Sequence, residues 1–252
     1  MNILVCNDDG IHAPGIRVLY DAVKDLGHVH VVAPNEEQSA VGHSITLFDP
    51  IKTSKVYDKD TFFGHAVGGT PTDCVKLASC ALLNQPPDVV FSGINLGANT
   101  GINIIYSGTV SAATEAAILK IPSMAFSLQT FTDPHWDTAG HVARQLAKKF
   151  LPYQLPEKTL LNVNIPNIPT DQIQGYAVTP MAHSRFKEVF HKRTDPRGNI
   201  YYWLDGEMEL LGDKKGTDIE AIENGLVSIT PIGLDLTHYQ VIDQIKKFIE
   251  DE

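Results

Sequence analysis

Short apolar runs alternate with amphipathic helical patterns along the first two thirds of the chain, and this alternation limits the possible folds most. Residues 3–6 form a continuous apolar run, which is typical of a strand buried on both faces of a parallel sheet. A helical pattern then begins at Pro14 and ends at Gly27, and a second apolar run over 29–33 follows. These segments form one strand–helix–strand unit of about 30 residues.

The same alternation continues to residue 165. We expect the following segments in chain order: a helix over 71–83, a strand over 88–91, a helix over 109–119, a strand over 121–126, a helix over 135–150 and a strand over 160–165. This order predicts an α/β fold, namely a Rossmann-like, mostly parallel sheet with helices on both faces.

The rest of the chain has a different pattern. Aromatic residues over 201–204 follow a turn-rich stretch, which predicts a C-terminal β-hairpin extension, and a helical stripe over 241–249 closes the chain. An isolated hairpin is marginal in water, so this extension is expected to pack on a partner subunit. We therefore expect a Rossmann-like catalytic core over 1–175, and a hairpin extension and C-terminal helix used in oligomerisation over 176–252.

Composition narrows the function classes. The formal net charge of −10 opposes binding to the phosphate backbone of a nucleic-acid polymer. No stretch approaches the ~20 apolar residues that cross a bilayer, and the amino terminus lacks the basic start of a signal peptide. The three cysteines, at positions 6, 74 and 80, cannot all pair with one another. We expect a cytoplasmic protein that binds neither a membrane nor a nucleic-acid polymer.

Loops after three predicted strands carry hard oxygen ligands. Asp8 and Asp9 follow the first strand, Ser39 lies just past the second, and Asn95 follows a later one. The carboxyl ends of parallel strands share one edge, so these loops are expected to converge. Two adjacent carboxylates repel each other unless a cation lies beside them. We expect this set to bind one Mg²⁺ or Mn²⁺, with Asp8 and Asp9 catalytic. The alternative is a plain turn at Asp9 with Asp8 as a helix cap.

A second candidate feature is a helix start rich in small residues, formed by Ser107, Gly108 and Thr109. The free amides and the dipole of such a start bind phosphate oxygens well. Ordinary capping by Ser107 or Thr109 is the alternative. The chain has no dinucleotide fingerprint, no Walker-type lysine motif and no Gly-x-Ser-x-Gly elbow, which weakens cofactor and esterase interpretations.

Taken in order, these motifs resemble the SurE family, whose members are survival-protein 5′/3′-nucleotidases. The likeness covers nearly the whole chain and rests on the motifs over 3–10, 38–44, 69–74, 92–95, 106–109, 162–166, 216–218 and 230–231. The acidic stretch over 35–37 departs from the family, in which many members are more basic there.

The resemblance has implications for the site and for assembly. It implies a divalent-metal site formed by Asp8, Asp9, Ser39 and Asn95. It also implies a phosphate cradle formed by Asn99, Ser107, Gly108 and Thr109. Finally, it implies a homodimer or tetramer built by exchange of C-terminal segments.

The expected reaction is hydrolysis of nucleoside 5′- and 3′-monophosphates by metal-activated water, with short polyphosphate as a possible further substrate. A covalent aspartyl-phosphate route is disfavoured, because its two acids have a different spacing. One alternative is a non-catalytic nucleotide-binding stress scaffold with the same fold. Another is a glycosyltransferase-like nucleotide-sugar enzyme, whose two domains would need roughly 300 residues or more.

Overall fold

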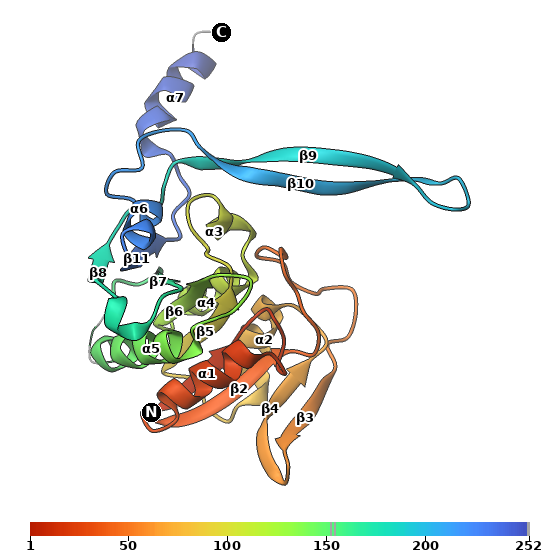
Figure 1. Ribbon diagram of the computed structural model, residues 1–252, viewed down its shortest axis with the longest axis vertical. Coiled ribbons are helices and arrows are strands. Elements are labelled where there is room, and N and C mark those ends of the chain that lie inside the picture. The colour runs from red at the N-terminus through yellow and green to blue at the C-terminus, as the bar shows by residue number, and fades with distance from the viewer. Residues whose placement is uncertain (152, 154, 251–252) are drawn as a thin grey trace.

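A sheet of nine strands forms the centre of the molecule (Figure 1). The computed structural model describes residues 1–151, 153 and 155–250, so the last two residues of the C-terminal extension lie outside it. The strands of the sheet are β1 Asn2–Cys6, β2 His28–Pro34, β3 Thr53–Asp58, β4 Thr61–Val67, β5 Val89–Leu96, β6 Ser123–Gln129, β7 Thr159–Pro166, β8 Gly175–Val178 and β11 Leu226–Gly233. They are ordered β3-β4-β2-β1-β5-β6-β7-β11-β8.

Most neighbouring strands in this sheet run parallel. The run from β4 through β2, β1, β5 and β6 to β7 is parallel throughout. Two pairs are antiparallel, β3 with β4 and β11 with β7. The predicted α/β fold with a mostly parallel sheet is therefore confirmed.

Side chains of β1 alternate between two hydrophobic layers, because successive residues of a strand point to opposite faces. Ile3 and Val5 pack in the layer covered by helices α1 Pro14–Val23 and α5 Trp136–Phe150. Leu4 and Cys6 pack in the layer covered by α2 Pro71–Leu77 and α4 Gly108–Ile118. Both faces of the sheet carry helices, as predicted.

The C-terminal part contributes both to the sheet and to an arm. The antiparallel strands β9 Ser184–Thr194 and β10 Ile200–Leu210 form a long ribbon that projects from the body (Figure 1). The short α6 Asp218–Glu223 and strand β11 follow, and α7 Ile242–Glu250 closes the described chain. The predicted hairpin and closing helix are present, and β11 returns to the main sheet beside β7.

Several elements differ from the sequence prediction in extent. The helix expected over 71–83 is α2 followed by one π-helical turn, Ala78–Leu82. Strand β5 continues to Leu96, so Asn95 is the next-to-last residue of this strand and does not lie in a loop. Two further short helices are α3 Asn103–Tyr106 and the 3-10 turn Thr170–Gln172, and a second 3-10 turn, Tyr239–Val241, leads into α7. In the part of the chain that the structure describes, no helix is both long and apolar enough to cross a bilayer.

The position of β1 within the sheet locates the functional crevice. After β1 the chain forms β2 on one side, and it later forms β5 on the other side of β1. A crevice opens at such a switch point, at the carboxyl ends of the strands, and in open α/β sheets it is the usual ligand site.

Candidate active site

A cavity of about 240 Å³ opens beside the carboxyl ends of β1 and β5. Its walls come from five separate segments of the chain. Five of the side chains expected from the sequence line it: Asp8, Ser39, Asn95, Asn99 and Ser107. Asp9, Gly108 and Thr109 do not line it. The cavity thus brings together the loop after β1, the loop after β2 and the end of β5.

The two adjacent carboxylates lack a cationic partner. Asp8 is 4% exposed and Asp9 is half-buried. Burial raises the pKa of Asp8, and burial together with the charges of Asp8 and Glu37 raises the pKa of Asp9 to about 7. Among the described residues, neither carboxylate forms an ion pair with a lysine, arginine or histidine. A bound cation would relieve this repulsion.

Two neutral side chains complete an oxygen-rich donor set. The Ser39 hydroxyl donates to Glu37 Oε1 at 2.6 Å, which leaves its oxygen lone pairs available. The Asn95 amide nitrogen donates to the Gly97 carbonyl at 2.8 Å, which leaves Asn95 Oδ1 as the acceptor. Within the described chain no group of three or more histidine, cysteine or acidic side chains could hold a metal. Two carboxylates with hydroxyl and amide oxygens fit Mg²⁺ or Mn²⁺.

The start of α4 packs directly against Asp8. Thr109 is fully buried, and its hydroxyl donates to Asp8 Oδ1 at 2.5 Å. A Cβ atom on Gly108 would lie 2.7 Å from Asp8 Cβ, so only glycine permits this approach. The Thr109 hydroxyl therefore holds the carboxylate, and Thr109 does not line the cavity.

Ser107 caps α4 and also lines the cavity. Its Oγ accepts a hydrogen bond from the Val110 amide at 3.1 Å, so it is the N-cap of α4. Its side chain also lines the cavity, and the hydroxyl proton remains available for a ligand. Capping and anion binding are compatible at this residue.

Asn99 is held in the cavity wall by side chains of two neighbouring strands. The backbone N–H of Asn99 donates to Asn164 Oδ1 at 2.8 Å. The backbone carbonyl of Asn99 accepts from Asn162 Nδ2 at 2.8 Å and from Asn164 Nδ2 at 3.1 Å. The Asn99 side-chain nitrogen donates to Ser127 Oγ at 2.8 Å. The roles of Asn162 and Asn164 were not predicted, although two asparagines in an apolar strand are a signal, because buried amides need partners.

The nearby His43 is engaged away from the two aspartates. Its Nε2 lies 2.9 Å from Oε2 of Glu115, a buried carboxylate on α4 that also accepts from Lys76. Burial raises the pKa of Glu115, but these two hydrogen bonds and the charge interactions with the same two residues together outweigh it and hold the pKa below its usual value. His43 thus ties its loop to α4.

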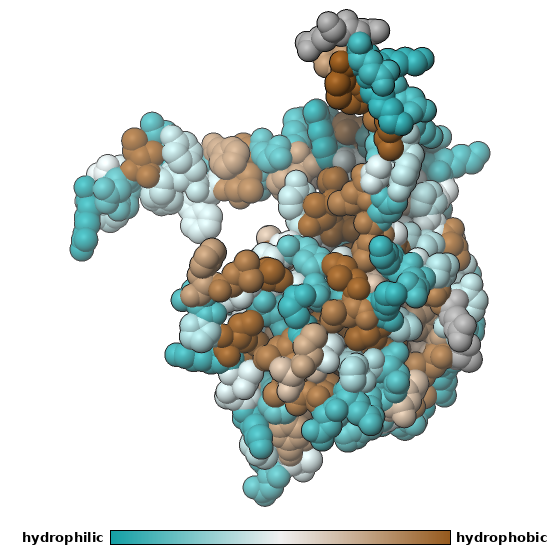
Figure 2. Space-filling model, turned by 180° about the vertical axis from the view of Figure 1, so that it is seen from behind, coloured by the Kyte–Doolittle hydropathy of each residue, from teal (hydrophilic) through white to brown (hydrophobic). Residues whose placement is uncertain are grey.

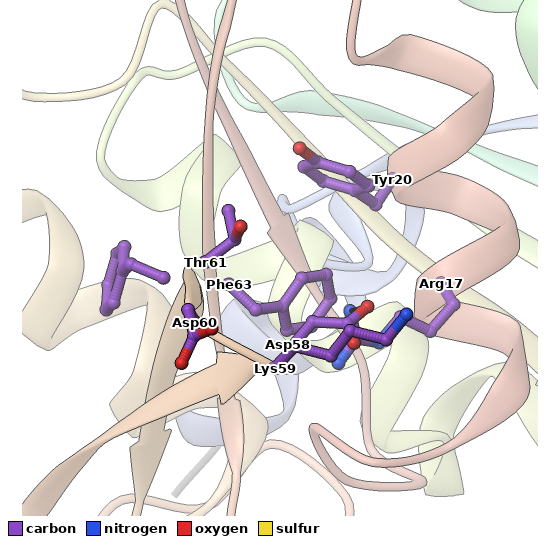
Figure 3. A pocket seen from close by; sticks show the side chains of 8 residues that line it. Arg17, Tyr20, Asp58, Lys59, Asp60, Thr61 and Phe63 are labelled. Carbon is purple, nitrogen blue, oxygen red and sulfur yellow. Dashed lines mark hydrogen bonds and ion pairs between the residues drawn. The ribbon is translucent and has the colours of Figure 1, made fainter.

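A larger cavity of about 510 Å³ lies between α1 and the turn that joins β3 to β4 (Figure 3). Arg17 lies 3.2 Å from the centre of the Phe63 ring and pairs with Asp58 at 3.3 Å. Arg17 is thus already engaged, and the other charged residues that line the cavity are Lys59 and Asp60. None of the expected site residues lines this cavity, so it is not the candidate active site.

The outer wall of the active-site cavity was not predicted. Asn103, Tyr106 and Phe131 line it. Tyr106 belongs to a motif noted in the sequence, but no pattern marks Asn103 or Phe131, which enter the wall only through tertiary packing.

Comparisons with known proteins agree with this geometry. The family model described as survival protein SurE matches residues 3–188. A protein of Syntrophobacter fumaroxidans named 5′-nucleotidase SurE is 48% identical over 98% of this chain and 99% of its own. One of the same name from Thermosynechococcus vestitus is 48% identical over 99% and 97%.

A solved structure shows the same fold. The crystal structure of the SurE protein from Aquifex aeolicus superposes with a TM-score of 0.85 at 44% identity, covering 98% of this chain and 99% of the other. The fold expected from the sequence is therefore confirmed at full length. The family match, the curated relatives and this structure agree, and the chain belongs to the SurE family.

Proposed function

We propose that the protein is a 5′-nucleotidase, a phosphoric monoester hydrolase that releases phosphate from nucleoside 5′- and 3′-monophosphates. The observation that carries this proposal is the single cavity shared by Asp8, Ser39, Asn95 and the start of α4. Oxygen donors suited to a cation, beside a helix start suited to phosphate oxygens, support hydrolysis of a phosphate ester. The relatives' shared name, 5′-nucleotidase SurE, supports the same activity.

One divalent cation, Mg²⁺ or Mn²⁺, would be held by Asp8, Asp9, Ser39 and Asn95. When bound, it would lower the pKa of a coordinated water and offset charge on the phosphoryl oxygens. Thr109 holds Asp8 in place through its hydroxyl. Thr109 engages one oxygen of Asp8, and Asp8 lines the cavity, so the second oxygen of Asp8 or the carboxylate of Asp9 would orient the attacking water and accept its proton.

The phosphate would lie against the amino end of α4. Ser107 has a hydroxyl proton to donate, and the first amides of the helix carry no intrahelical partner. Gly108, whose missing side chain makes room for Asp8, would contribute its backbone amide to this helix start. Asn99 also lines the cavity and would add its side-chain amide, while three hydrogen bonds fix its backbone. These donors would hold the equatorial oxygens during in-line attack.

Two finer features belong to the same proposal. Short polyphosphate would enter as a further substrate, because the site recognises a terminal phosphate. The protein would work in the cytoplasm, because its three cysteines, Cys6, Cys74 and Cys80, are free thiols, as is usual in a reducing compartment.

We also propose that the protein forms a homodimer or tetramer by exchange of C-terminal segments. Apolar side chains of the arm and of α7 face solvent in one chain (Figure 2). They include Phe190, Trp203 and Leu204 on the arm and Phe248 on α7. Exposed apolar surface of this kind marks a protein contact.

Metal dependence is the direct test of this function. Extensive chelation should abolish phosphate release from a nucleoside monophosphate, and Mg²⁺ or Mn²⁺ should restore it. Asp8→Asn should lose activity yet stay folded, because removal of one carboxylate relieves repulsion in the metal-free protein. Asp21→Asn, at an exposed position of α1, is the matched control and should retain activity.

Other outcomes would reject the proposal. Full activity after exhaustive chelation would contradict the metal mechanism. Nucleotide binding without phosphate release at any metal concentration would favour the non-catalytic scaffold. Transfer from a nucleotide sugar without hydrolysis of monophosphates would favour the glycosyltransferase.

A further inference from the structure

Two aromatic rings border the active-site cavity and remain open to solvent. Phe131 is 82% exposed and Tyr106 is 55% exposed, yet both line the cavity with Asp8 and Ser107. Single exposed apolar side chains are common on protein surfaces. These two differ because they border the same polar cavity from separate parts of the chain.

The Phe131 ring has a defined position despite its exposure. It lies against Gly97, which has a φ of +107°, and a Cβ atom at Gly97 would lie 2.7 Å from Phe131 Cε1. The ring therefore rests on bare backbone of the cavity wall. Most of its surface stays available for a ligand.

The segment that carries Phe131 is braced by polar contacts on both sides. The Thr132 amide donates to Thr130 Oγ1 at 3.1 Å. Asn167 donates to the Asp133 carbonyl at 3.1 Å and accepts from the His135 amide at 2.8 Å. A ring held in this way loses little conformational entropy when a ligand packs on it.

The size of the cavity indicates which part of a substrate would meet this ring. A volume of about 240 Å³ is below the roughly 300 Å³ at the lower end for pockets that enclose a drug-sized ligand. Phosphate and sugar would therefore fill the interior, between Asp8 and Ser107. A nucleobase would lie at the open rim, where Phe131 is exposed.

We propose that Phe131 is the base-stacking residue of this site and makes nucleoside monophosphates the preferred phosphomonoesters. The proposal rests on the nucleotidase function proposed above and names the part of the substrate that is recognised. Every nucleobase has an aromatic face, so stacking tolerates different bases. The enzyme should accept purine and pyrimidine nucleotides while discriminating against sugar phosphates without a base.

The test compares adenosine 5′-monophosphate with ribose 5-phosphate, which has the same ester and sugar but no base. Stacking of one base on an aromatic side chain corresponds to about a five- to 150-fold change in affinity. In Phe131→Ala the ratio of the two kcat/KM values should fall by about that factor. Phe131→Tyr should keep the ratio, and Tyr57→Ala, an exposed ring on β3, is the matched control.

Three results would overturn the proposal. An unchanged ratio in Phe131→Ala, with both substrates affected equally, would show that the ring only shapes the site. A lower native mass together with equal losses would assign Phe131 to a subunit contact. Hydrolysis of ribose 5-phosphate as fast as the nucleotide by the unaltered protein would show that no base is recognised.

Failure of the proposed function is distinguishable from failure of the stacking. If the unaltered protein hydrolyses neither ester, equilibrium dialysis with labelled adenosine 5′-monophosphate decides the second question. Tighter binding of the nucleotide than of ribose 5-phosphate, lost in Phe131→Ala, would support stacking without turnover. Equal binding of the two compounds by the unaltered protein would contradict it.

Discussion

Asp9 illustrates how single residues in this site favour function at the expense of stability. Its carboxylate is partly removed from water and lies within the field of Asp8 and Glu37, and its pKa is about 7. A carboxylate arranged only for folding would have a nearby cation or several donors. A metal bound as proposed would reduce the cost of this arrangement and so link stability to metal binding.

The first prediction concerns the pH dependence of stability in the metal-free protein. The pKa of Asp9 is raised in the folded state, so the folded protein binds more protons than the unfolded one between pH 3.8 and about 7. Stability should therefore fall as pH rises through this window. Denaturant unfolding should show Asp9→Asn more stable than the unaltered protein at pH 8, by about 1 to 2 kcal/mol after allowance for solvent screening.

The effect of metal provides the control for that prediction. At pH 8, Mn²⁺ should stabilise the unaltered protein against denaturant and should stabilise Asp9→Asn much less. Equal stability of the two metal-free proteins between pH 5 and pH 8 would show that Asp9 has an ordinary pKa.

The second prediction separates Thr109 from Ser107. The Thr109 hydroxyl donates to Asp8, so Thr109→Val should weaken Mn²⁺ binding and catalytic efficiency by about ten- to hundredfold. Thr109→Ser keeps the hydroxyl and should retain most of the Mn²⁺ binding and most of the catalytic efficiency.

Ser107→Ala should instead weaken inhibition by inorganic phosphate, because Ser107 lines the cavity. Mn²⁺ binding followed by electron paramagnetic resonance gives a readout independent of turnover. If Thr109→Val weakens phosphate inhibition and leaves Mn²⁺ binding intact, its hydroxyl serves the phosphate.

At the scale of elements, β7 supports the cavity wall through its buried asparagines. Asn164 makes two hydrogen bonds to the Asn99 backbone, and Asn162 makes one. Asn162 Oδ1 is also buried without a partner among the described residues. The two side chains therefore contribute unequally to the same loop.

The third prediction follows from that inequality. Leaving a buried polar group without its partner costs about 1 to 3 kcal/mol. Asn164→Ala should lower the free energy of unfolding by about 2 to 4 kcal/mol, and Asn162→Ala by about 1 to 2 kcal/mol, because it also removes an unsatisfied carbonyl. KM for a nucleotide should rise more in Asn164→Ala. Denaturant unfolding and steady-state kinetics measure these differences, and equal effects of the two changes would contradict the arrangement.

Elements buried on both faces were predictable from the sequence. Strand β1 and its neighbours read as continuous apolar runs, and α1 and α5 show clear helical spacing. Strand β3 was missed because nearly all its residues face solvent, so its sequence has no apolar pattern. Strand β11 was missed because it follows the arm and contains Pro231, which argues against a central strand.

Part of the candidate site could also be predicted from the sequence, because the fold class determines which strand ends lie together. The carboxyl ends of parallel strands meet at one edge, so Asp8, Ser39 and Asn95 could be grouped without coordinates, although Asn95 lies at the end of β5 rather than in a loop. The direction of the Thr109 hydroxyl could not be predicted, since it depends on how closely α4 approaches β1. Phe131 enters the cavity wall through contact with Gly97, more than thirty residues earlier in the chain, and no local pattern records this contact.

At the scale of the whole molecule, the active-site wall and the base of the arm share hydrogen bonds. Asp218, at the start of α6, accepts from the Gly101 amide and from the Ala182 amide, each at 2.8 Å. Ser184, the first residue of β9, accepts from the Ile102 amide at 3.1 Å. The loop that follows Asn99 is thus fixed to the segment from which the arm projects. A partner subunit that holds the arm would also stabilise this side of the cavity.

The last prediction concerns assembly. None of the described residues of α7 is buried, and Ile245, Phe248 and Ile249 expose apolar side chains along it. Burial of such side chains contributes about 1.5 to 3 kcal/mol each, so their exposure in a free chain is unfavourable. Ile245→Glu combined with Phe248→Glu should therefore lower the native mass measured by light scattering, whereas Lys247→Glu on the same helix should not. Removal of the chain after residue 237 should give monomers or aggregates, because β11 stays intact while the exchanged segment is lost. A truncated protein that remains soluble at unchanged native mass would refute exchange through α7 and leave the arm as the subunit contact.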